Sequence, residues 1–102
     1  MRTPVMLSTG RGTDGRLVLS ATGELDMSNI DAFNRALADA LTQADGSPVE
    51  VDLRGVEYLD SGAINALFPY ADRVHVLANP ILMPVLTISG LTEVTRVDPG
   101  SR

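Results

Sequence analysis

The sequence contains no cysteine and a single histidine, His75, among its 102 residues. Without cysteine the chain can form neither a disulfide nor a thiolate metal site, and it has no cysteine nucleophile. One histidine cannot supply the several imidazoles of a histidine-rich metal cluster. The composition therefore points away from thiol and metal chemistry, and we expect no cofactor.

Lysine is also absent, so all eight basic residues are arginines, and they are scattered along a chain of net charge −5. A nucleic-acid-binding face needs clustered basic residues, and we expect no nucleic-acid partner. The N-terminus lacks the features of a signal peptide, which makes a cytoplasmic location the default expectation. The most apolar window, residues 74–91, is interrupted by Pro80 and Pro84 and predicts a buried strand and helix instead of a segment inserted in a membrane.

The chain length suits one compact domain and is too short for two, so residues 1–102 are expected to form a single domain. Two short runs of strand-forming residues, 4–9 and 16–22, flank a turn-rich segment and predict a hairpin or a pair of adjacent strands. Helical periodicity follows in residues 28–41. Ser28 is predicted to cap this helix, with a carboxylate three residues later completing a variant of the capping box.

Strands and helices are predicted to alternate in the second half of the chain. Residues 49–53 alternate apolar and acidic side chains, which indicates a strand that breaks at residues 54–55. Asp60 is well placed to cap a second helix. That helix should be short, because Pro69 disfavours a helical conformation at the residue before it.

The remaining elements are a strand at 73–78, a helix between 79 and 90, a strand at 93–97 and a frayed tail at 98–102. Pro84 lies inside this third helix, which therefore either begins near Pro84 or bends there. The order ββαβαβαβ predicts an α/β fold, with a mixed, mostly parallel sheet of about five strands and three helices mainly on one face.

Three short motifs occur in a characteristic order and spacing: Gly-Glu-Leu-Asp at 23–26, Asp-Leu-Arg-Gly-Val at 52–56, and Asp-Ser at 60–61. Each alone is weak, but together they resemble the STAS domain family, named for sulfate transporters and anti-sigma factor antagonists. The resemblance covers most of the chain and is closest to stand-alone bacterial anti-sigma factor antagonists. It implies a protein-binding regulator, not an enzyme, which sequesters an anti-sigma factor with serine-kinase activity and so frees a sigma factor.

The resemblance also implies a phosphorylation switch at the start of the second helix, in the pattern Asp-Ser-Ser/Thr-Gly. In an ungapped match Ser61 is the first serine of the pattern, and Gly62 occupies the acceptor position. A shift by one residue would make Ser61 the acceptor, but it would displace Asp60 and move Ile64 and Leu67 off matching apolar positions. Ser61 is thus the candidate phosphorylation site, and an ordinary exposed serine is an equally weighted alternative.

The expected partner-binding residues lie in the loop around residues 23–28 and at the start of the second helix. They are Glu24, Asp26, Ser28, Asp60, Ser61 and Gly62. Glu24 and Asp26 could act as general acid and base, but neighbouring carboxylates in a loop are usually solvated, so we assign them to a partner-facing rim. The alternative function is a STAS-type accessory subunit of a membrane transport complex, docked at the cytoplasmic face, which the missing acceptor hydroxyl fits at least as well.

Overall fold

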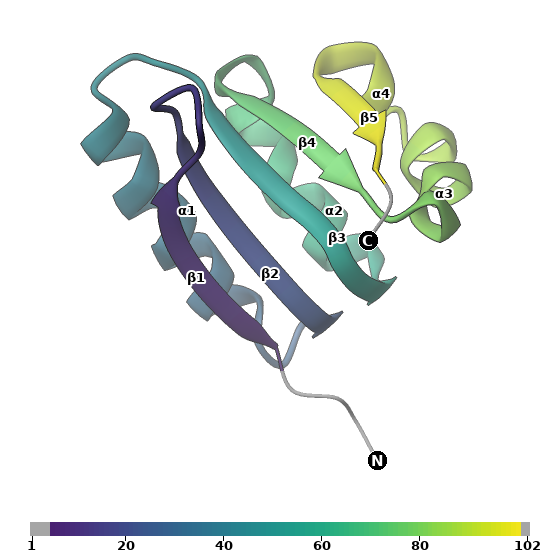
Figure 1. Cartoon of the computed structure of the whole chain (residues 1–102). Coiled ribbons are helices and arrows are strands. Elements are labelled where there is room, and N and C mark those ends of the chain that lie inside the picture. Colours follow the sequence, from purple (N-terminus) through teal and green to yellow (C-terminus); the bar gives the residue numbers. More distant parts are fainter. Residues whose placement is uncertain (1–4, 101–102) are drawn as a thin grey trace.

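A five-stranded mixed sheet forms one layer of the structure, a computed structural model that describes residues 5–100 (Figure 1). The strands are β1 (Met6–Arg11), β2 (Leu17–Leu25), β3 (Val49–Leu59), β4 (Val74–Ala78) and β5 (Arg96–Pro99). They lie in sequence order, with β1 antiparallel to β2 and every later neighbouring pair parallel. The predicted α/β fold with a mostly parallel sheet is confirmed.

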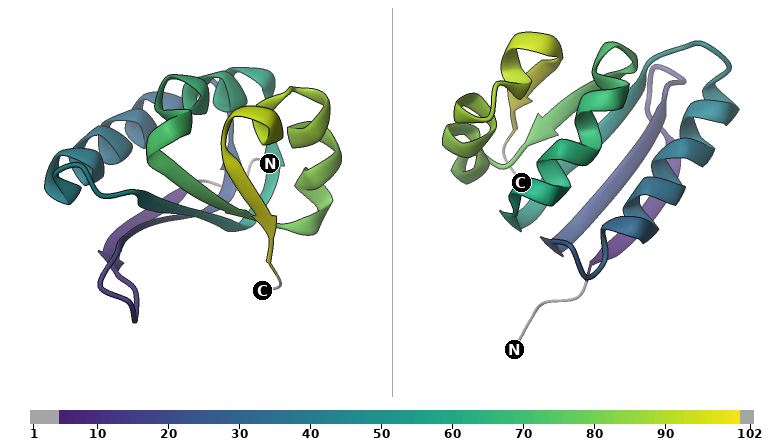
Figure 2. Two further views of the ribbon diagram at one scale, coloured as in Figure 1. Left: turned by 90° about the horizontal axis from the view of Figure 1, so that it is seen from above. Right: turned by 180° about the vertical axis from the view of Figure 1, so that it is seen from behind.

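Helices cover one face of this sheet and leave the other face without helices (Figure 2). The α-helices are α1 (Ile30–Ala44), α2 (Ser61–Leu67), α3 (Met83–Ile88) and α4 (Leu91–Val94), and the 3-10 helices are η1 (Phe68–Arg73) and η2 (Pro80–Leu82). Among the described residues, no helix combines the length and the apolar character that crossing a membrane requires.

The core lies between the sheet and the helices. Alternate residues of the three central strands point toward the helices and are buried, because side chains of a strand alternate between its two faces. These residues are Leu17, Leu19, Ala21, Val49, Val51, Leu53, Val74, Val76 and Ala78. Helix α1 packs Phe33, Leu37, Ala40 and Leu41 against them, at the spacing that places residues on one helical face.

The start of α1 differs from the prediction, because Asn29 and not Ser28 is the N-cap residue. The Ser28 hydroxyl donates a hydrogen bond to the Asp26 carboxylate, so the serine side chain bonds within the loop and does not cap the helix. The Asn29 side chain is also engaged in the loop and makes no capping bond. Local hydrogen bonding by short polar side chains thus competes with capping here.

Strand β3 does not break at residues 54–55, as the sequence predicts, but continues to Leu59. Its pairing with β2 shifts instead, since β2 advances two residues from Ser20 to Thr22 while the paired positions of β3 advance from Asp52 to Gly55. Gly55 permits the close approach of the two strands, because a Cβ atom there would lie 2.5 Å from the Cγ2 atom of Thr22. The glycine therefore marks a bulge within the strand, not its end.

The third helix, expected between residues 79 and 90, is divided into η2 and α3, and α4 follows it where the predicted strand at 93–97 should begin. Pro84 falls in the first turn of α3, so the helix begins near this proline and does not bend around it. Gly90 ends α3 with a positive φ of 88° and separates it from α4. Strand β5 therefore starts later than the predicted strand at 93–97 and extends into the expected tail, whose last residues, 101–102, lie outside the described residues.

Candidate functional site

The candidate site lies where β2 and β3 end and where α1 and α2 begin. Because β2 and β3 are parallel, their carboxyl ends meet at the same edge of the sheet. The loop after β2 therefore lies beside the first turn of α2, and the Asp60 N–H donates to the Leu25 carbonyl at 3.3 Å. This geometry brings together the two motif segments that the sequence separates by more than thirty residues.

Asp60 holds these two segments together with its carboxylate. Its Oδ1 atom accepts a hydrogen bond from the Ala63 N–H at 2.9 Å, which caps α2 and confirms the predicted N-cap. Its Oδ2 atom accepts a second hydrogen bond from the Met27 N–H at 3.1 Å. One side chain thus fixes both the start of the helix and the position of the neighbouring loop.

The loop before α1 is organised by Asp26 and Asn29. Asp26 is only 5% exposed, and its Oδ1 atom accepts hydrogen bonds from the backbone N–H and the hydroxyl of Ser28. Asn29 accepts from the Asp26 N–H at 3.0 Å and donates to the Glu24 carbonyl at 2.8 Å. The structure therefore places Asp26 beneath the predicted partner-facing rim, while Ser28 is exposed and Glu24 half-buried.

Gly62, at the acceptor position of the STAS pattern, is covered by Met27. A Cβ atom at Gly62 would lie 3.1 Å from Met27 Cγ and 3.4 Å from Asp60 Oδ1, so the methionine would have to shift to admit it. Met27 itself is 77% exposed. Sequence reasoning did not place Met27 in the site, because no local pattern reveals a contact between residues so far apart in the chain.

Ser61 is the first residue of α2 and is exposed. It lines a shallow groove of about 140 Å³ between α2 and α3. The other lining residues are Ile64, Asn65, Val85, Ile88 and Ser89. The groove has no ionisable side chain in its lining, so it can offer apolar contacts and a few hydrogen bonds but no acid–base pair.

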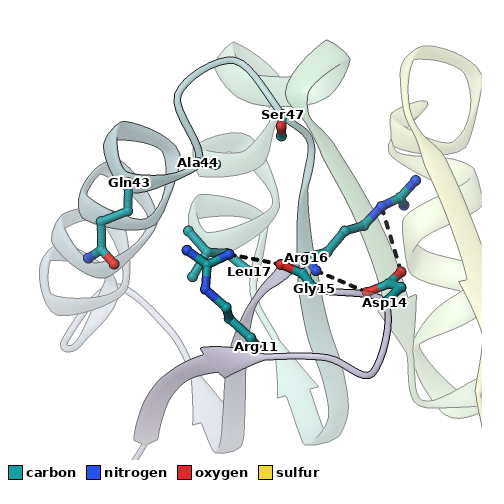
Figure 3. A pocket seen from close by; sticks show the side chains of 8 residues that line it. All are labelled: Arg11, Asp14, Gly15, Arg16, Leu17, Gln43, Ala44 and Ser47. Carbon is teal, nitrogen blue, oxygen red and sulfur yellow. Dashed lines mark hydrogen bonds and ion pairs between the residues drawn. The ribbon is translucent and has the colours of Figure 1, made fainter.

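A second cavity, of about 290 Å³, lies at the opposite end of the sheet between the β1–β2 hairpin and the end of α1 (Figure 3). Its two arginines are engaged within the hairpin. Arg11 donates to the Gly15 carbonyl at 2.8 Å, and the Arg16 guanidinium lies 3.7 Å from the Asp14 carboxylate. None of the predicted site residues lines this cavity.

The sheet face without helices carries paired charges. Arg54 donates two hydrogen bonds to the Asp52 carboxylate, at 2.9 and 2.8 Å, and these lower the pKa of Asp52 and raise the pKa of Arg54. His75 Nε2 lies 2.8 Å from Asp98 Oδ2, and this hydrogen bond, with a further one from Arg96, lowers the pKa of Asp98. The Asp52–Arg54 pair lies within β3, the His75–Asp98 contact links β4 to β5, and both lie on the face opposite to α2.

Comparison with known proteins agrees with this architecture. The family model described as "Mlab, STAS domain" matches residues 8–97, so the chain belongs to the STAS domain family. No match was found among curated protein sequences. Within residues 5–100 no group of three or more histidine, aspartate or glutamate residues is arranged to hold a metal ion.

Solved structures with this fold include several anti-sigma factor antagonists. One from Mycobacterium paratuberculosis is 24% identical with a TM-score of 0.83, over 95% of this chain and 87% of that one. SpoIIAA of Bacillus, in its unphosphorylated form, is 15% identical with a TM-score of 0.73, over 95% and 90% of the two chains. A protein of Thermotoga maritima, described as a possible antagonist, is 17% identical with a TM-score of 0.68, over 94% and 87%. These likenesses establish the shared fold.

Proposed function

We propose that the protein is an anti-sigma factor antagonist, which binds an anti-sigma factor of the serine-kinase type and so frees a sigma factor. The observation that carries this proposal is the junction at Asp60, where the Gly-Glu-Leu-Asp loop and the Asp-Ser start of α2 form one surface. The antagonist fold of the solved relatives supports it. Such a protein would work in the cytoplasm, where its partners act.

The proposed activity is binding and not catalysis. Asp26 is buried in hydrogen bonds with Ser28, so it is poorly placed to exchange protons with a substrate. Asp60 is likewise committed to two backbone N–H groups. A general acid or base needs an accessible proton-transferring atom within reach of a bound substrate, and these carboxylates serve the backbone instead.

Regulation of the proposed site differs from the STAS pattern, because Gly62 has no hydroxyl to phosphorylate. Ser61 is the one hydroxyl residue in the first turn of α2, and it is exposed. A phosphate there would add nearly two negative charges beside Asp60. Repulsion between this phosphate and one carboxylate about 4 Å away would amount to about 1–4 kcal/mol, depending on the local dielectric. Without such a phosphate, the protein would be constantly competent to bind.

A second candidate function is an accessory subunit docked on a membrane transport complex at its cytoplasmic face. Gly62 favours it, since a subunit that is not switched by a kinase needs no acceptor hydroxyl. Both candidates use the same surface, and only the identity of the partner separates them.

The experiment is a tagged pull-down from the native organism, with mass spectrometry of the partners and of the intact bait. We expect the wild type to retain an anti-sigma factor with a kinase domain. Asp60→Ala should weaken this binding. Asp52→Ala is the matched control, since it removes a carboxylate from the face without helices. Recovery of transporter subunits with an unmodified bait would establish the second candidate and reject the first.

A further inference from the structure

Helices α2 and α3 carry no charged residue. Residues 61–71 and 79–92 contain none, although 21% of the chain is charged. Ile88 is 86% exposed at the end of α3, and with Val85 it forms one wall of the groove against α2. Exposed aliphatic side chains gathered beside a groove are typical of a surface that another molecule covers.

Met27, from the loop between β2 and α1, places a second apolar side chain beside the first turn of α2. Ser61 lines the groove toward α3, whereas the next residue, Gly62, lies beneath the side chain of Met27. The first turn of α2 therefore has apolar side chains from two different elements on either side of it. Methionine is flexible and polarisable and adapts its shape to a partner surface.

The surroundings of this surface are acidic. The loop after β2 and the first turn of α1 meet the start of α2 through Asp60, and residues 23–34 and 58–62 contain no basic residue. Their acidic residues are Glu24, Asp26, Asp31 and Asp60, and the next basic residue along α1 is Arg35, one turn after Asp31. Arg54, the nearest basic residue before the second segment, is held by Asp52 on the opposite face. A partner that fits this end of the molecule would carry positive charge around an apolar centre.

We propose that Met27 and the α2–α3 groove together form a docking surface for an amphipathic helix of the partner protein, apolar on one side and flanked by Lys and Arg. The inference rests on the proposed function in one respect only, that this end of the molecule binds a partner. A helix presents apolar anchors at i, i+3, i+4 and i+7, which suits a surface with a groove on one side and a flexible apolar side chain on the other.

Gly62 has a specific part in this surface. The absence of a Cβ atom lets Met27 lie across the first turn of α2, where another STAS protein would present an acceptor hydroxyl. Replacing Gly62 by serine would require Met27 to move and would put a hydroxyl into an apolar contact. The pair Met27 and Gly62 thus makes the surface selective for an apolar partner side chain.

The test is a titration of the isotopically labelled protein with two synthetic peptides, followed through its backbone amide NMR signals. Both peptides are helix-forming, have about 18 residues, or roughly five turns, and share one apolar face. One carries Lys and Arg beside that face, and the other carries Glu at the same positions. We expect the basic peptide to shift the amides of Met27, Ser61, Asn65 and Ile88, with weaker binding at high salt.

Variants then assign the contact. Met27→Asp and Ile88→Asp are each expected to weaken binding of the basic peptide at least tenfold. The matched controls are Met6→Asp and Val94→Asp, which change exposed apolar residues on β1 and α4 and should leave binding unchanged. Gly62→Ser should weaken binding less than Met27→Asp does.

Three outcomes would overturn the inference. The first is equal binding of the acidic peptide, and the second is the absence of amide shifts at about 1 mM basic peptide. The third is concentration-dependent self-association that Ile88→Asp abolishes, because a second copy of the chain would then occupy the surface. The peptides need no anti-sigma factor. Failure here therefore leaves the pull-down result intact, and recovery of a different partner leaves the peptide result intact.

Discussion

The sheet face without helices and the α2 end of the molecule use charge and packing in opposite ways. On the open face, Arg54 and Arg96 neutralise carboxylates of their own chain at short distances. At the α2 end, Glu24, Asp31 and Asp60 lie in segments that meet at the start of α2, and helices α2 and α3 carry no charged residue. The first region pairs its carboxylates with basic side chains, whereas the second binds Asp26 and Asp60 to backbone N–H groups and leaves Met27 and Ile88 exposed.

The two glycines of the motif region show the same contrast in packing. Gly55 lies against the side chain and backbone of Thr22 in a neighbouring strand, whereas Gly62 lies beneath the flexible side chain of Met27. A strand neighbour cannot move without disturbing the sheet, but an exposed methionine can adopt another rotamer. One glycine is therefore needed for the fold, and the other shapes the proposed docking surface.

The largest expected effect is that of Gly55→Ala. The added Cβ atom would lie 2.5 Å from Thr22 Cγ2, and the overpacking should lower the free energy of unfolding by about 1–3 kcal/mol. Urea denaturation of the purified protein measures this change. The double variant Gly55→Ala with Thr22→Ser removes the clashing methyl and should recover part of the loss. Wild-type stability in the single variant would show that the two strands are not closely apposed.

Asp60→Ala should have the next largest effect. Loss of the N-cap is expected to cost about 0.5–2 kcal/mol, and the Met27 N–H loses its acceptor as well. Asp60→Asn keeps an acceptor oxygen for one of these bonds and should lose less. Thermal unfolding followed by circular dichroism gives the comparison, and equal stability of both variants and the wild type would contradict the bridging role.

Gly62→Ala should change stability by less than about 1 kcal/mol. Alanine favours a helix by about that amount over glycine, while the required shift of Met27 opposes the gain. The measurement is the same urea denaturation as for Gly55→Ala. A loss as large as that of Gly55→Ala would break the contrast between the two glycines.

Arg54→Gln should have the smallest effect, and this effect should disappear in acid. Because Arg54 lowers the pKa of Asp52 below its ordinary value of 3.8, the ionised pair contributes stability above that pH, and this contribution is lost as the pH falls through the lowered pKa. For a partly exposed pair the contribution is below about 1 kcal/mol. Stability curves measured between pH 7 and pH 2 should therefore differ between wild type and variant near neutral pH and converge at low pH.

The order of elements and the mostly parallel sheet were predictable because they follow from local periodicity. Alternation in residues 49–53 and the helical spacing within α1 are properties of short windows. The position of the α1 cap was not predictable, because Ser28 and Asn29 are both good capping residues. The choice between them depends on the buried carboxylate of Asp26. Competing local hydrogen bonds of this kind leave no distinct pattern in the sequence.

The site was predictable in its segments but not in its contacts. The motifs pointed to Asp60 and the loop after β2, and Asp60 caps α2 as predicted, but only the structure shows that the two segments meet at one edge of the sheet. The cover of Gly62 by Met27 depends on how two distant elements meet, and the extension of β3 past Gly55 depends on its pairing with β2. Both are tertiary effects. In β3 the pairing with β2 overrides the local preference of glycine for the end of a strand.

The most direct measurement of the central claim is amide hydrogen exchange of the protein alone and in complex with the partner recovered from its native organism. The account predicts slower exchange at residues 23–29, 60–66 and 83–89, with little change at His75 and its neighbours on β4. Slower exchange confined to β4 and β5, with unchanged exchange at α2, would contradict the assignment of the α2 end as the partner-binding surface.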